Sequence, residues 1–179
     1  MLIQNKERIA MGFLRKLLGL EKKEEASGRK GISIEETFEY EEDLIDQFKD
    51  DHLELFEIFA QIKETYEENP EFSHKLVDLL DEFKTGLEMH ILVEDKKLYT
   101  YLRKKYGGDE LHEAMLNDLQ RNMTKIAKSV IFFVKKYSNR ENFERNKDKF
   151  LKDLGEVGDT LTKRTSMEER KLYPMYSKQ

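Results

Sequence analysis

The sequence contains no cysteine and no tryptophan, and only two prolines among its 179 residues. The absence of cysteine excludes disulfides, thiolate metal sites and cysteine nucleophiles together. Any metal site must therefore use imidazole and carboxylate ligands. No apolar run approaches the ~18 residues of a membrane-spanning helix; the longest uninterrupted one is Val130–Val134. We therefore expect no stable membrane insertion.

The sequence also lacks an excess of basic residues, because its formal net charge is −5. This balance argues against a general attraction for nucleic acid. Charged residues make up 39% of the chain and hydrophobic residues 38%, and the mix of Glu, Lys and Leu with few prolines is typical of an all-α protein. The length suits one domain of ordinary size. We expect a cytoplasmic protein.

Residues 1–33 are predicted to form an N-terminal extension and flexible linker. Met11–Leu20 is a short amphipathic stretch, and a polar segment over 21–31 follows it. An alternative is a weak anchor to a membrane or a protein partner, although the apolar face is too short to bind strongly alone. The stretch lacks the hydrophobic region and cleavage site of a signal peptide.

Residues 34–179 are predicted to form an antiparallel four-helix bundle with up-down-up-down topology. Apolar residues recur at helical spacing in four segments, over about 33–69, 70–105, 109–137 and 140–173. The joints between the segments are short, which favours antiparallel neighbours. They are marked by Asn69-Pro70, Gly107-Gly108 and Ser138-Asn139. A possible capping box, Ser33 with Glu36, opens the first segment.

The centre of the second segment carries two polar residues on an apolar face. His90 and Glu94 are four residues apart and share that face with Leu87 and Leu98. A buried imidazole and a buried carboxylate need partners, because an unpaired charge in an apolar interior costs several kcal/mol. Alone, the pair is consistent with a histidine at the core edge bonded to its own carboxylate. Partners on other helices would favour a metal site.

The second and fourth segments repeat each other weakly. Residues 89–99 align with residues 163–173 without a gap. The alignment places Glu94 on Glu168 and Tyr99 on Tyr173. Two inward carboxylates from two helices repel each other unless they are protonated, paired or bridged by a cation. The repeat therefore favours a cation at the bundle centre.

Five inward-facing polar residues, drawn from all four segments, form a candidate metal site. They are His52, His90, Glu94, His112 and Glu168. Nitrogen and oxygen donors of this kind suit iron, manganese or zinc, with the carboxylates as bridges between two ions. His112 falls in a first helical turn, where side chains are often solvated. His74 has the same kind of position and is interpreted as a surface residue.

The order and spacing of these residues resemble the hemerythrin-like, or HHE cation-binding, family. The resemblance covers about residues 38–176. It depends on Asp51-His52-Leu-Glu-Leu-Phe, on His90-x-x-x-Glu94 followed by Leu98-Tyr99, on His112 18 residues beyond Glu94, and on Glu168-Glu-Arg-Lys-Leu-Tyr-Pro174.

The resemblance implies a non-haem di-iron site inside the bundle. Such sites bind O₂ reversibly, sense oxygen, iron or redox state, or handle nitric oxide and peroxide. By position, His52 and His90 resemble the terminal ligands of one iron ion. Glu94 and Glu168 resemble the two bridging carboxylates, and His112 resembles a terminal ligand of the other ion.

The chain departs from the family pattern at two ligand positions. Arg164 stands where family members usually have a histidine four residues before the last carboxylate, and Gly108 stands at a second histidine position. A guanidinium has no free acceptor and cannot bind a metal. We therefore expect a single ion or an asymmetric pair, in a protein that senses, carries or stores O₂, iron or nitric oxide and is not primarily an enzyme.

Two other functions stay open from the sequence. In one, the protein is a metal-free interaction module in which Arg164 pairs with Glu168 and Glu94. In the other, it is a peroxide or nitric-oxide reductase, for which Glu169 or a tyrosine is the available proton donor.

Overall fold

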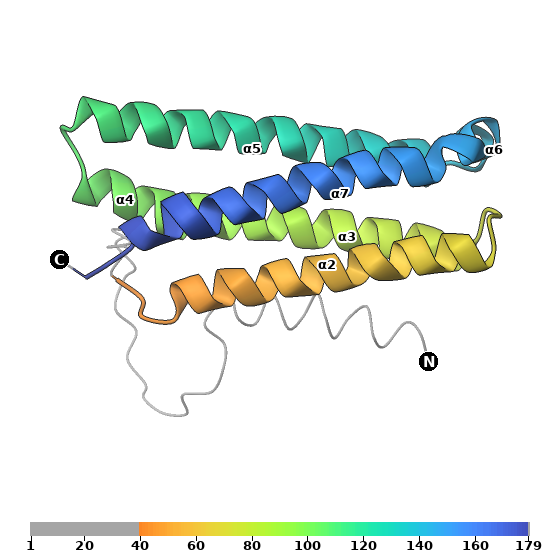
Figure 1. The fold of residues 1–179 in the computed structure, drawn as a ribbon, viewed down its shortest axis with the longest axis horizontal. Helices are drawn as coiled ribbons and strands as arrows, with labels where there is room; N and C mark the ends of the chain where they lie inside the picture. Colours follow the sequence, from red (N-terminus) through yellow and green to blue (C-terminus); the bar gives the residue numbers. More distant parts are fainter. Residues whose placement is uncertain (1–39, 179) are drawn as a thin grey trace, which may run out of the picture. The chain divides into compact units, whose positions relative to one another are not determined.

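The computed structural model describes residues 40–178, and four long helices with no strand form this part of the chain. The helices are α2 (Leu44–Glu68), α3 (His74–Val93), α5 (Glu110–Tyr137) and α7 (Phe150–Met167). Consecutive helices run in opposite directions along a common axis, as Figure 1 shows. The predicted all-α four-helix bundle is confirmed. The expected extension over 1–33 and the Ser33–Glu36 capping pair lie outside the described residues.

Shorter helical elements extend or join the four helices. After α3 come a π-helical segment, η1 (Glu94–Tyr99), and α4 (Thr100–Lys105). Before α7 come α6 (Arg140–Asn146) and a 3₁₀ turn, η2 (Lys147–Lys149). After α7 come a second π-helical segment, η3 (Glu168–Leu172), and a 3₁₀ turn, η4 (Tyr173–Met175). Both π-helical segments begin at a carboxylate of the internal repeat, and π-helical turns occur often at functional sites.

The first two helices begin later than the sequence predicts. Residues 40–43 are not helical, because the chain there turns against the C-terminal end: the Glu41 N–H donates to the Tyr176 hydroxyl at 2.7 Å. The second helix begins at His74, after Pro70, because the Ser73 hydroxyl caps it by accepting the Leu76 N–H at 3.2 Å.

The turn between α4 and α5 is where the glycine pair predicts it. Gly108 has a φ of +91°, a left-handed conformation that glycine adopts without strain. The predicted fourth helix is interrupted at Lys147–Lys149, so it is not one continuous helix. The Lys147 carbonyl accepts a hydrogen bond from the Tyr66 hydroxyl at 2.5 Å, which gives this break a partner on α2.

The apolar faces of the four long helices form the core. Leu79, Phe83, Leu87 and Leu98 are buried, as their helical spacing predicts. Among residues 40–178, seven polar residues are also buried, and all except Thr65 belong to the site described below. They are Asp51, His52, Thr65, His90, Glu94, Arg164 and Glu168. No helix in the described range 40–178 is long and apolar enough to span a membrane.

Candidate metal centre

Three of the predicted ligands meet inside the bundle: His52 of α2, His90 of α3 and Glu168 at the start of η3. Each offers one ligand atom, and these atoms lie within 4.8 Å of one another. All three residues are buried. Within the described residues this is the one group of three or more such side chains close enough to share a metal ion. We call it the ligand group.

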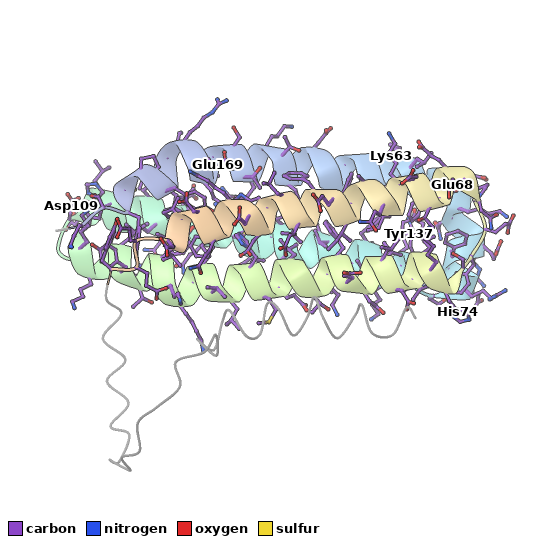
Figure 2. The ribbon with its side chains drawn as sticks, turned by 90° about the horizontal axis from the view of Figure 1, so that it is seen from below. Lys63, Glu68, His74, Asp109, Tyr137 and Glu169 are labelled. Carbon is purple, nitrogen blue, oxygen red and sulfur yellow. The ribbon has the colours of Figure 1, made fainter. Side chains whose placement is uncertain are left out.

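The two histidines of the ligand group are held differently. His52 Nε2 lies 3.2 Å from Glu168 Oε2 and 3.3 Å from the Tyr173 hydroxyl. Its Nδ1 lies 3.5 Å from Glu169 Oε1 but makes no hydrogen bond. Figure 2 labels Glu169 part-way along the bundle, and its side chain is half exposed. His90 Nδ1 instead lies 3.4 Å from Asp51 Oδ2, and both of these side chains are largely buried.

Arg164 connects the ligand group to two other helical segments. Its Nε donates to Glu168 Oε1 at 2.5 Å, and Nη1 donates to the Leu119 carbonyl of α5 at 3.2 Å. Nη2 donates to the Tyr99 hydroxyl at 3.1 Å and lies 3.6 Å from Glu94 Oε2. The side chain is only 2% exposed. The guanidinium is thus a buried cation between the two carboxylates of the repeat.

The pKa values of the two carboxyl groups of the repeat, Glu94 and Glu168, are shifted in opposite directions. Burial raises the pKa of Glu94 well above its usual range, and the charge of Glu168 raises it further, while Arg164 lowers it only in part. Burial also acts to raise the pKa of Glu168, but the hydrogen bond from His52 and the charge of Arg164 outweigh it, so the pKa is lowered. Without a metal, Arg164 and His52 therefore favour the ionised form of Glu168, whereas burial favours the protonated form of Glu94.

The structure does not bring His112 to the ligand group. His112 lies in the first turn of α5, where Nδ1 is 2.8 Å from Asp109 Oδ2 and the ring stacks on Tyr106 with centroids 4.3 Å apart. Asp109 lies at one end of the bundle (Figure 2). Asp109 caps α5, so His112 is bound to the helix terminus. The expectation that His112 would lie beside a second ion is not supported by this arrangement.

Glu94 is buried next to the ligand group without belonging to it. Its Oε2 faces Arg164, whereas Oε1 is buried and makes no hydrogen bond. His90 Nε2 is likewise buried without a hydrogen-bond partner. Buried polar atoms are normally paired, so each unpaired one needs an explanation, such as an ion.

The donor set fits one cation and does not fit two. Two imidazoles and a carboxylate are suitable ligands for iron, manganese or zinc. A cavity of about 20 Å³, enough for one water-sized molecule, is lined by the ligand group, Arg164, Thr165 and apolar residues. The guanidinium of Arg164 already lies between Glu94 and Glu168, where a second ion would have to bind. Helix α5 contributes the Leu119 carbonyl as a partner of this guanidinium, and not a histidine.

Two contacts of the site were not recognised in the sequence. One is Asp51, which directly precedes His52 in the sequence. An acidic residue next to a predicted ligand was the signal that could have indicated it. The Leu119 carbonyl carries no sequence signal, because every residue has one.

Comparison with known proteins agrees with this geometry. The family model of the hemerythrin HHE cation-binding domain matches residues 43–176. The chain therefore belongs to the hemerythrin HHE cation-binding family. Searches of curated proteins and of solved structures found no match. Family and candidate group together support a cation-binding four-helix domain.

Proposed function

We propose that the protein binds one non-haem iron ion through His52, His90 and Glu168, and acts in sensing, carrying or storing O₂, iron or nitric oxide. The observation that supports this most strongly is the unpartnered Nε2 of the buried His90 beside His52 and Glu168. A buried imidazole nitrogen that has no hydrogen-bond partner and lies beside a second imidazole and a carboxylate is a suitable ligand for a cation.

The proposal of a single ion depends on Arg164. A carboxylate that bridges two metal ions with one oxygen on each ion needs both oxygens free. Glu168 Oε1 is bonded to the guanidinium, so only Oε2 is directed at His52. A second ion would also meet the fixed positive charge of Arg164 in a poorly solvated interior, where like charges repel strongly.

The ion would supply open coordination positions for a small ligand, because three protein ligands do not fill its coordination sphere. The side chains control access to those positions. Leu55, Leu161 and Met123 line the cavity next to the ligand group and give it an apolar wall. The small cavity, about 20 Å³ in volume, favours a small ligand, and O₂ or nitric oxide is the class of ligand that we infer.

Anaerobic loading with Fe(II), followed by desalting and metal analysis, tests this function. We expect about one iron per chain in the wild type and a large loss in the His90→Ala variant. His74→Ala is the matched control, because His74 lies on the same helix and is exposed. Absence of bound iron in the wild type, or equal retention by His90→Ala and His74→Ala, would overturn the proposal.

A metal-free interaction module is the second candidate, and one observation favours it. Arg164 already neutralises the ionised Glu168 and makes hydrogen bonds to three groups. The Arg164→His variant distinguishes the two functions. If the wild type binds no metal and the variant does, the site is a relic of a di-iron centre. If the wild type binds one ion and the variant binds more, the single-ion proposal is supported.

A further inference from the structure

We propose that Asp51 is a positioning residue that fixes the tautomer of His90 and so directs an unprotonated Nε2 at the cation. This inference is conditional on the proposed function, because it assigns a role toward the same ion. Asp51 touches no ion itself. It acts through the His90 ring, whose Nδ1 lies 3.4 Å from Asp51 Oδ2.

The His90 ring has little freedom besides its tautomer. It is 2% exposed and meets Phe48 edge-on, with centroids 5.5 Å apart at an interplanar angle of 83°. On another side it contacts the His52 ring, with centroids 4.8 Å apart. The surrounding rings therefore restrict reorientation of the imidazole, so the main remaining variable is which of its two nitrogens carries the proton.

The contact with Asp51 determines which nitrogen carries the proton. An ionised carboxylate only accepts hydrogen bonds, so the facing Nδ1 must be the protonated nitrogen. Nε2 of the neutral ring is then a lone-pair donor, and this atom has no hydrogen-bond partner. A carboxylate behind a metal-binding histidine is the arrangement that orients the ring and raises its basicity as a ligand.

The sequence explains how helix α2 provides both a ligand, His52, and the residue that positions the second ligand, Asp51. Asp51 and His52 are adjacent in α2, and adjacent helical residues point about 100° apart. His52 is thereby directed into the ligand group while Asp51 is directed at His90 of the neighbouring α3. The Asp51 side chain is 11% exposed and that of Glu169, which faces His52, is 46% exposed. Asp51 is thus the better shielded of the two carboxylates.

The Asp51→Asn variant tests this role. The asparagine amide can accept a hydrogen bond from Nδ1–H or donate one to unprotonated Nδ1, so it no longer requires the proton on Nδ1. The tautomer with the proton on Nε2, which offers the ion no lone pair at that nitrogen, then becomes populated. We expect ¹⁵N NMR of the metal-free full chain to show an Nδ1–H tautomer of His90 in the wild type and a larger population of the Nε2–H tautomer in the variant. Fe(II) affinity should fall about 10- to 100-fold. Asp50→Asn is the control, because Asp50 is the exposed preceding residue.

A second variant removes the acceptor altogether. Asp51→Ala should populate the Nε2–H tautomer of His90 at least as much as Asp51→Asn does, and should bind Fe(II) no more tightly than Asp51→Asn. An unchanged His90 tautomer and an unchanged Fe(II) affinity in Asp51→Ala would overturn the role of Asp51. A wild type that binds no Fe(II) would overturn the proposed function instead, and the NMR measurement would still report the tautomer separately.

Discussion

The guanidinium of Arg164 donates from Nε to Oε1 of Glu168 at 2.5 Å, between the two carboxylates of the internal repeat. Its Nη2 lies 3.6 Å from the other carboxylate, Glu94. In the alignment of the two repeat halves, Arg164 takes the place that His90 has in the other half. The bundle therefore keeps both carboxylates but places a protein cation where the family pattern has a metal-binding imidazole.

Removing the Arg164 charge should destabilise the metal-free protein strongly. In the Arg164→Met variant, the buried Glu168 loses its cation and the Leu119 carbonyl loses its donor. Breaking a buried ion pair on one side costs roughly 3 kcal/mol or more. Urea unfolding monitored by circular dichroism measures the change. The control is Arg145→Met, which breaks the exposed i,i+4 pair with Glu141 and should cost about 0.5 kcal/mol. Similar losses in the two variants would contradict the role assigned to Arg164.

Two glycines of α7 should respond differently to alanine. A Cβ at Gly158 would lie 2.6 Å from Cζ of Phe59, whereas a Cβ at Gly155 meets nothing within 4 Å. Gly155→Ala should therefore raise the free energy of unfolding by up to about 1 kcal/mol through helix propensity. Gly158→Ala should lose that gain to the clash and be less stable than Gly155→Ala.

The double variant Gly158→Ala/Phe59→Leu checks the cause of that difference. Shortening the side chain at residue 59 removes the clashing atom, so the penalty of Gly158→Ala should be smaller in the Phe59→Leu background. Thermal unfolding of the four proteins gives the coupling between the two sites. A coupling of zero would show that Phe59 is not the reason for the glycine.

Asp153 should contribute stability that disappears in acid. Burial acts to raise its pKa, but hydrogen bonds from Lys136 at 2.8 Å and Tyr137 at 2.7 Å outweigh burial and lower the pKa. A carboxyl whose folded pKa is depressed stabilises the fold above its unfolded pKa of about 3.9. That contribution is lost as the pH falls through the folded pKa.

The Asp153→Asn variant measures this contribution. It should be about 1 kcal/mol less stable than the wild type near pH 7, and the two proteins should converge below about pH 4. Unfolding in urea across this pH range provides the test. Asp159→Asn, at an exposed position of the same helix, should follow the wild type throughout. A constant difference between Asp153→Asn and the wild type at all pH values would contradict the account.

Helical spacing was sufficient to predict the four helices and the inward faces of His52, His90 and Glu168. The internal repeat further predicted that Glu94 and Glu168 would be equivalent, and the pairing of Arg164 with both carboxylates was among the expected alternatives. These features depend on which face of a helix a residue occupies. A period of 3.6 residues specifies that face directly.

The position of His112 depends on more than its helical face. Its spacing is compatible with an inward position, but it lies in the first turn of α5, where the capping carboxylate of Asp109 and the Tyr106 ring are nearer partners. The contact of Asp51 could not be predicted for a different reason, because its partner, His90, belongs to the neighbouring helix α3. Which helix lies on that side follows from the packing of the bundle and not from the spacing within α2.

Crystallography of the iron-loaded wild type with anomalous scattering at the iron edge tests the central claim most directly. The account predicts one anomalous peak, within bonding distance of His52, His90 and Glu168, with the Arg164 guanidinium still on Glu168 Oε1. Two peaks bridged by Glu94 and Glu168, with Arg164 displaced, would contradict it.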